Sequence, residues 1–259
     1  MKLKVFSDIH LEHYTGSQIF PHLGSGDVLI LAGDILSARY FKTKGYLHSV
    51  YDTFLEDCSK NYDKILYVMG NHEFYGYNYE GTFKTIKENL PSNFHLLEND
   101  TVKIGDWSFI GSTLWTNFRN ENPLDMMEAN GYMNDYKVIR IGSNYRKLNP
   151  DDTLGFHKKS KAYLLKKLEE LKDENVFVIS HHSPTLQSIP EEFKTSTCNA
   201  AYCSDLDDLI LAHPNIKHWI YGHSHTAMDF YIGGCRVINN AVGYPGQDTG
   251  FDLHFYLNL

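Results

Sequence analysis

Residues that can bind metal ions or move protons follow directly after five apolar segments of the chain. The segments cover residues 2–6, 28–32, 65–69, 176–179 and 219–221. The residues that follow them are Asp8, His10, Asp34, Asn71, His72, His181, His182, His223 and His225. Carboxylate, carboxamide and imidazole groups together suit hard or borderline divalent ions such as Mn, Zn, Fe or Ni, and not a thiolate-rich structural zinc site. This pattern predicts a metal-dependent reaction centre.

The apolar segments themselves predict how these side chains are brought together. A short apolar run with no polar face is typical of a strand buried in a sheet. In open α/β sheets, ligands bind outside the carboxyl ends of the strands. We therefore expect the five loops to converge on one crevice.

The number of donors predicts more than one metal ion. Seven of these residues are the candidate ligands, namely Asp8, His10, Asp34, Asn71, His181, His223 and His225. Seven donors are too many for one such ion, whereas two ions that share a carboxylate fit the count, and Asp34 is the candidate for the bridge. Paired ions roughly 3.5–4 Å apart lower the pKa of a bridging water and clamp the attacking and leaving oxygens of an in-line displacement. That chemistry suits phosphoesters, although the donors alone leave a peptidase or an amidohydrolase open.

Composition limits the class of partner. The net charge of −8 argues against a protein that grips a long phosphate backbone. No apolar run approaches the length of a membrane span, and Asp8 lies too close to Met1 for a signal peptide core, so we expect a cytoplasmic protein without a membrane partner. The length favours a single α/β domain over residues 1–259.

The remaining periodicity predicts a mixed fold. Helices are expected at residues 46–62, 79–90, 151–172 and 205–212, with Asp151, Asp152 or Thr153 capping the third. Short strands at 94–97, 101–104 and 107–110 break the alternation of strand and helix, which favours a mixed sheet or a second sheet packed on the first. Further strands are expected at 228–232, 236–238 and 253–257, and an irregular segment at 12–26.

Residues 112–150 show no convincing periodicity and predict a substrate-facing insertion. Charged or aromatic side chains within it are candidates for substrate contact, and solvated loop charges are an equally good interpretation of each one. These candidates are Asp135, Tyr136, Arg140, Arg146 and Lys147, and Tyr75 and His182 are two further candidates outside the segment.

The order of the motifs resembles that of the calcineurin-like metallophosphoesterase superfamily. The motifs are D-x-H at Asp8, G-D at Gly33, G-N-H-E at Gly70, a strand-end histidine at His181 and G-H-x-H at Gly222. The resemblance implies a four-layer sandwich of two mixed β-sheets flanked by helices. It also implies that His72 is not a ligand but contacts the phosphate and protonates the leaving oxygen. By the same resemblance, one metal takes Asp8, His10, Asp34 and His225, and the other takes Asp34, Asn71, His181 and His223.

The resemblance also has departures. Protein Ser/Thr phosphatases of this superfamily continue G-D with x-x-D-R-G, whereas residues 35–39 here read I-L-S-A-R. The aspartate that would orient the catalytic histidine is missing, which argues against phosphoprotein substrates. Residues 111–116 and 133–136 are instead similar to small bacterial and phage metallophosphoesterases. Between two adjacent histidines, we expect His181 to be the ligand and His182 to lie near the substrate.

The expected function is hydrolysis of a small or nucleotide-based phosphodiester or phosphomonoester by in-line attack of a metal-bridging hydroxide. A metal-dependent nuclease is an alternative, but its basic track is missing because the basic residues are scattered or lie within 158–172. A second alternative is a metal-bound recognition module without turnover. The oligomeric state has no signal in the sequence.

Overall fold

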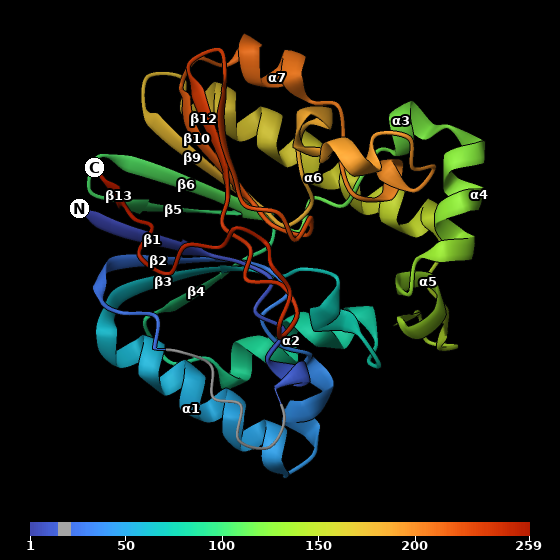
Figure 1. The fold of residues 1–259 in the computed structure, drawn as a ribbon, viewed down its shortest axis with the longest axis horizontal. Helices are drawn as coiled ribbons and strands as arrows, with labels where there is room; N and C mark the ends of the chain where they lie inside the picture. Colours follow the sequence, from blue (N-terminus) through green and yellow to red (C-terminus); the bar gives the residue numbers. More distant parts are fainter. Residues whose placement is uncertain (15–21) are drawn as a thin grey trace.

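The strands of the protein form two large sheets stacked face to face (Figure 1). The computed structural model describes residues 1–14 and 22–259, so part of the segment expected to be irregular lies outside the described residues. The first sheet has the order β13 (Leu257–Asn258), β1 (Lys2–Phe6), β2 (Gly26–Ala32), β3 (Tyr62–Val68) and β4 (Phe94–Leu97). The second has the order β11 (Met228–Ile232), β12 (Cys235–Asn239), β10 (Ile216–Tyr221), β9 (Asn175–Ser180), β6 (Trp107–Ser112) and β5 (Asp100–Ile104).

Both sheets are mixed, as expected. β1, β2, β3 and β4 run parallel and β13 is antiparallel to them. In the second sheet β6, β9, β10 and β12 run parallel, while the edge strands β5 and β11 are antiparallel. Helices lie in several of the parallel connections, such as α1 (Tyr46–Asn61) between β2 and β3.

Alternation along each strand builds three apolar layers. On β2, Val28 and Ile30 face the second sheet, whereas Leu29 and Leu31 pack with α1 and with α2 (Tyr79–Asn89). On the other side, α6 (Pro150–Glu170) and α7 (Asp207–Ala212) cover the second sheet. Because both faces are covered, these strands read as continuous apolar runs in the sequence. The four-layer α/β/β/α arrangement is confirmed.

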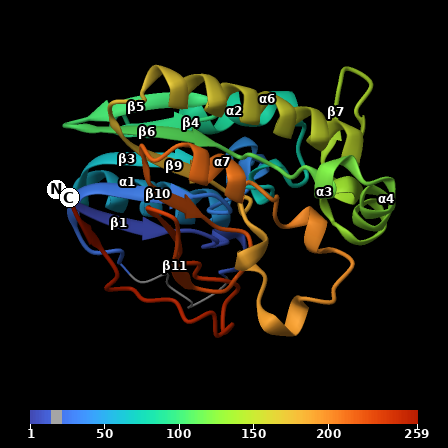
Figure 2. The ribbon, with the colours of Figure 1, turned by 90° about the horizontal axis from the view of Figure 1, so that it is seen from above.

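Residues 112–150, which show no convincing periodicity in the sequence, nevertheless form short regular elements. These are α3 (Phe118–Glu121), α4 (Pro123–Tyr132), α5 (Asp135–Val138) and a small hairpin of β7 (Arg140–Ile141) and β8 (Arg146–Lys147). The helices are short, and α4 buries only Asp125 and Ala129, so there is little apolar periodicity to detect. α3 and α4 lie at the end of the sheets opposite the two chain termini (Figures 1 and 2).

Two boundaries also differ from expectation. α6 begins at Pro150, because a proline at the first helical position has no amide hydrogen to leave unpaired. Asn149 caps the helix and exchanges hydrogen bonds of 3.0 Å with Asp152 in a capping box. Of the strand expected at 253–257, only Leu257 belongs to a strand, β13. Asp252 instead forms hydrogen bonds with Asn240 and with the His254 amide, and not with a neighbouring strand. No helix of the described residues is apolar over enough of its length to cross a membrane.

Candidate metal centre

The predicted donors lie at one end of the two sheets. β1 starts beside the N-terminus, so its carboxyl end and those of its parallel neighbours lie at the opposite end, near α3 and α4 (Figures 1 and 2). The loops after β1, β2 and β3 carry Asp8, His10, Asp34 and Asn71, and the loops after β9 and β10 carry His181, His223 and His225. The amide of Gly222 donates to the carbonyl of His181 at 2.9 Å, which joins the two loops of the second sheet.

The donors form two groups joined by Asp34. Asp8, His10 and His225 form one group and Asp34, His181 and His223 the other, with the ligand atoms of each group within 4.8 Å of one another. Asp34 Oδ2 lies 3.8 Å from His10 Nε2, while Asp34 Oδ1 lies 3.4 Å from His181 Nε2. The Asn71 oxygen lies 3.0 Å from the same His181 nitrogen. One carboxylate therefore faces both groups.

The donor atoms fit divalent ions. His223 Nε2 is buried and finds no hydrogen-bond partner among the described residues, which costs free energy unless the atom binds a ligand. His10 Nε2 and His225 Nε2 face each other at 3.0 Å. Two imidazole nitrogens this close, together with a buried carboxylate, suit a shared cation.

Groups behind the donors fix their orientation. His181 Nδ1 donates to the Ala32 carbonyl at 2.9 Å, and His225 Nδ1 donates to Gln247 Oε1 at 2.8 Å. These bonds leave Nε2 of each ring to face the other donors, which is the usual outer support of metal-binding histidines. Asn71 Nδ2 donates to Asp135 Oδ1 at 2.8 Å, so its oxygen points the other way, toward His181.

The backbone of the site is strained. Asp8, His10, Asp34 and His223 all have positive φ, at 55°, 51°, 55° and 70°. Such φ values are uncommon for residues other than glycine, and they persist where the surroundings hold them. Here the Asp8 amide donates to the Gly33 carbonyl at 2.9 Å, and the His223 amide donates to the Asp8 carboxylate at 2.9 Å. A Cβ at Gly70 would collide with the Asp34 carboxylate, so only glycine fits before Asn71.

Glu73 holds the loops after β2 and β3 together. Its buried carboxylate accepts hydrogen bonds from the amides of Asp34 at 3.1 Å and Ile35 at 2.8 Å. It also accepts from the Gly70 amide and the Tyr67 hydroxyl, both at 2.6 Å. Burial and the charge of Asp34 raise the pKa of Glu73 to about 7. No role of Glu73 was predicted from the sequence.

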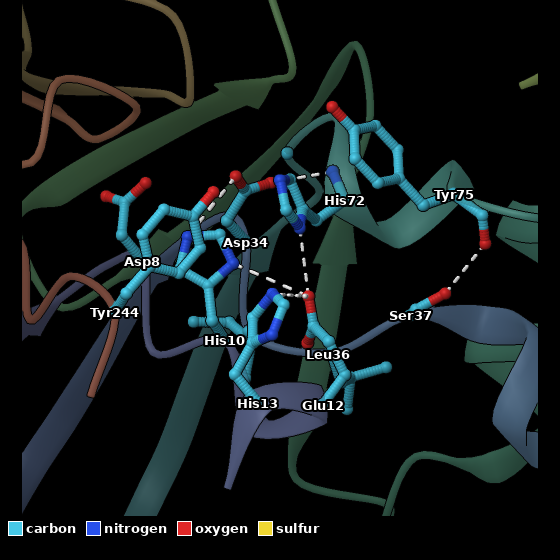
Figure 3. Close-up of polar contacts among 12 residues, drawn as sticks. Asp8, His10, Glu12, His13, Asp34, Leu36, Ser37, His72, Tyr75 and Tyr244 are labelled. Atoms are coloured by element: carbon cyan, nitrogen blue, oxygen red, sulfur yellow. Dashed lines mark hydrogen bonds and ion pairs between the residues drawn. The ribbon is translucent and has the colours of Figure 1, made fainter. Parts of the chain in front are cut away.

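His72 is held against Glu12 (Figure 3). The distance from His72 Nδ1 to Glu12 Oε1 is 2.9 Å, and the ring stacks on Tyr75 with centroids 4.1 Å apart. Burial opposes the charged forms of both groups. The charge of Asp34 and the contact with Glu12 nevertheless raise the pKa of His72 to about 9, and the hydrogen bonds with His10 and His72 lower the pKa of Glu12 to about 2.

A cavity of about 580 Å³ opens onto these groups. Tyr202 packs over His223 with ring centroids 4.6 Å apart, and Tyr244 packs over His225 at 4.7 Å. Tyr132, Met133 and Asn134 line one side, and residues 188–203 supply much of the rest. Among the described residues that line this cavity, none is lysine or arginine. A second cavity, on which Arg39 and His13 lie, shares His72, Tyr75, Asn134 and Tyr244 with the first.

The other predicted contact residues lie at different depths. Tyr75 lines both cavities, and Asp135 is buried behind Asn71. Five others are absent from the described linings of both cavities, namely Tyr136, Arg140, Arg146, Lys147 and His182. The Tyr136 hydroxyl bonds to Thr153 in the core, Arg140 donates to the carbonyls of Lys137 and Ile139, and His182 donates to the Thr113 carbonyl beside Trp115. Arg146 pairs with Asp152, and Lys147 is exposed.

Residues of the site that were not predicted from the sequence include Glu12, Glu73, Tyr244 and Gln247. Glu12 had a local signal, because it stands two residues after His10. Tyr244 and Gln247 had none. They reach the site because the amides of Val242 and Gly243 bond to the carbonyls of Ser7 and Asp8 at 3.0 and 2.9 Å, a contact between the two ends of the chain.

Two facing sheets whose strand-end loops gather carboxylate, amide and imidazole groups around a shared aspartate are the mark of a metal-dependent phosphoester hydrolase. Residues 1–227 match the model of the calcineurin-like phosphoesterases. The chain belongs to that family, as its motifs had indicated.

Individual proteins are similar to this chain in sequence or in fold over most of its length. An uncharacterized protein of Acanthamoeba polyphaga mimivirus is 28% identical over 278 residues, covering 99% of this chain and 96% of that protein. The fold is similar to a phosphopantetheinyl hydrolase from Mycobacterium tuberculosis, with TM-score 0.66, 17% identity and coverage of 94% and 90%. It is also similar to a putative 5'-nucleotidase from Staphylococcus aureus, with TM-score 0.53 and 18% identity, where 92% of this chain matches 48% of the other.

Proposed function

We propose that this protein hydrolyses a small phosphodiester or phosphomonoester at a centre of two divalent ions. The observation that carries the proposal is the Asp34 carboxylate, whose two oxygens face two separate groups of donors. Mn, Zn, Fe and Ni all suit these donors. One ion would be held by Asp8, His10, Asp34 and His225, and the other by Asp34, Asn71, His181 and His223. Bound ions would supply an activated water and neutralise charge on the phosphate.

The chain itself would contribute a proton and aromatic rings that cover the site. His72 Nδ1 is engaged by Glu12, so Nε2 is the atom from which a proton would pass to the leaving oxygen. The ring lines both cavities, so a leaving group can reach it from either side. Tyr75, Tyr202 and Tyr244 cover the site histidines and would exclude water around the phosphate.

The residues that line the cavity favour a small substrate of low charge. The described lining has no lysine or arginine and includes Glu192 and Asp248, so charge beyond one phosphate would be unmatched. Aromatic rings offer a surface for a planar or apolar group, and a nucleoside is one such group. The similarity in fold to a phosphopantetheinyl hydrolase and a putative 5'-nucleotidase supports a substrate of this size. Extended nucleic acid is disfavoured by the same lining and by the net charge of −8.

Residues 112–150 would serve as the substrate-facing insertion, since Tyr132, Met133 and Asn134 lie on the cavity wall. The apolar layer shared by the two sheets supports a single domain over residues 1–259. The four free cysteines, Cys58, Cys198, Cys203 and Cys235, are consistent with work in the reducing cytoplasm.

The test uses metal-stripped protein to which each divalent metal is returned separately. Bis(p-nitrophenyl) phosphate and p-nitrophenyl phosphate report on diester and monoester hydrolysis, and Asp34→Asn serves as the variant without a bridging carboxylate. We expect metal-dependent turnover that Asp34→Asn abolishes. The proposal is wrong if Asp34→Asn retains both turnover and metal content. Full metal occupancy without turnover of any phosphoester would favour a recognition module, and cleavage of single-stranded DNA in preference to small esters would favour a nuclease.

A further inference from the structure

We propose that Glu12 is the positioning residue of His72, holding its imidazole so that Nε2 faces the phosphoester. The inference rests on the proposed function, in which His72 protonates the leaving oxygen. The segment that follows Asp34 offers no aspartate for this purpose, because residues 35–38 are Ile, Leu, Ser and Ala. The carboxylate comes from the loop after β1, two residues beyond His10 (Figure 3).

The backbone fixes where the Glu12 carboxylate lies. Glu12 sits in a short 3-10 helix, Leu11–His13, which begins where His10 turns the chain with φ 51°. The Leu11 side chain is fully buried, and its amide donates to the Ile35 carbonyl at 3.0 Å. With only 8% of its side chain exposed, Glu12 has little freedom to turn toward solvent. The carboxylate is therefore built into the site.

The His72 ring is held on three sides. Tyr75 stacks on one face at 4.1 Å, and the His10 ring meets it edge-on at 4.3 Å. The Glu12 carboxylate closes the Nδ1 side at 2.9 Å. Because an ionised carboxylate only accepts hydrogen bonds, Nδ1 must carry a proton and Nε2 is the nitrogen left for substrate. Loss of Glu12 would free both the tautomer and the rotation of the ring.

Glu12 has one rival role, support of the predicted ligand His10. Glu12 Oε1 lies 3.4 Å from His10 Nδ1, a longer contact than the 2.9 Å to His72. The two roles differ in what they affect. Support of His10 would change metal binding, whereas support of His72 would change proton transfer and leave metal content unaltered.

The experiment is a double-mutant cycle in metal-loaded protein, with Glu12→Ala, His72→Ala and the double variant. It compares a phenyl phosphodiester with the p-nitrophenyl diester, whose better leaving group needs less protonation. We expect Glu12→Ala to lower kcat for the phenyl ester by about 10- to 100-fold and for the p-nitrophenyl ester by much less. In the His72→Ala background, Glu12→Ala should not lower kcat any further.

Two further variants and two further measurements complete the design. Glu12→Gln keeps an acceptor oxygen and should retain part of the rate, and Glu88→Gln, on the exposed face of α2, should behave as wild type. Metal content per chain should stay the same in every Glu12 variant. The imidazole Nδ1–H resonance of His72, assigned by its loss in His72→Ala, should disappear in Glu12→Ala, and it can be observed without turnover.

The outcomes separate the two proposals. Suppose that wild type hydrolyses the esters, and that Glu12→Ala lowers kcat as much in the His72→Ala background as in wild type. The positioning role is then wrong and the proposed function stands. Loss of metal in Glu12→Ala with an unchanged His72 resonance would assign Glu12 to His10. If wild type binds metal and cleaves no phosphoester, the proposed function fails, and the resonance alone decides whether Glu12 holds His72.

Discussion

The side-chain amide of Asn71 donates a hydrogen bond of 2.8 Å to the carboxylate of Asp135, and its oxygen thereby faces His181 at 3.0 Å. Asp135 is buried and also accepts from the Tyr75 hydroxyl at 2.9 Å. Asp135 was expected to touch substrate, and in the structure its carboxylate bonds to Asn71, a predicted metal ligand.

Asp135→Ala should therefore weaken metal binding. Without the carboxylate, the Asn71 amide can turn its nitrogen toward the metal site, and loss of such outer support typically costs 10- to 100-fold in affinity. Titration calorimetry of stripped protein with Zn²⁺ would measure the change. Asp106→Asn, in the exposed turn between β5 and β6, is the matched control and should bind as wild type. Unchanged affinity in Asp135→Ala would contradict this role.

Metal binding should stabilise the fold. An ion that binds only the folded state adds about 2.7 kcal/mol at a concentration of 100 times its Kd, which corresponds to about 5–10 °C in Tm for a chain of this size. Scanning calorimetry with and without chelator would show the shift. Asp34→Asn should lose most of it because Asp34 faces both donor groups. A shift that Asp34→Asn retains in full would argue against the shared carboxylate.

Two glycine substitutions should act in opposite directions. Gly70→Ala places a Cβ against the Asp34 carboxylate, so we expect several kcal/mol of destabilisation together with reduced metal uptake. Gly155→Ala lies within α6 where a Cβ meets nothing within 4 Å, so it should stabilise by about 0.5–1 kcal/mol. Urea unfolding measures both. Equal effects of the two substitutions on the free energy of unfolding would show that the site tolerates a Cβ at position 70.

A buried histidine away from the site should make stability depend on pH. His157 on α6 is 2% exposed, donates from Nδ1 to the Leu114 carbonyl at 3.1 Å, and has its pKa lowered by burial to about 4. Between about pH 6.5 and 4, the unfolded chain takes up a proton that the folded protein refuses, so the free energy of unfolding falls as pH falls, by about 3 kcal/mol at most.

His157→Asn should flatten that part of the pH profile, because the amide of asparagine can replace the Nδ1 donor without titrating. Urea unfolding between pH 4 and 7 would measure it. The exposed His254→Asn substitution serves as control and should keep the wild-type slope. An unaltered slope in His157→Asn would place the acid sensitivity elsewhere.

Sequence patterns predicted the elements with strong apolar signals and missed those without them. β1 and β4 match their expected bounds because buried strands leave continuous apolar runs. α4 was missed because it buries only Asp125 and Ala129. The donors were recognisable because each follows a strand, whereas Gln247 supports His225 through a contact between distant parts of the chain. Such contacts depend on tertiary packing, which local periodicity does not encode.

The division of the donors between the two sheets has a mechanical consequence. Asp8 and Asp34 follow strands of the first sheet, and His181 and His225 follow strands of the second. His10 and His225 are 215 residues apart in the chain and meet at 3.0 Å. An ion held between them would close nearly the whole polypeptide into a loop, as a removable cross-link does, and would restrict the unfolded chain accordingly. Ions bound at this site would thus also cross-link the two sheets.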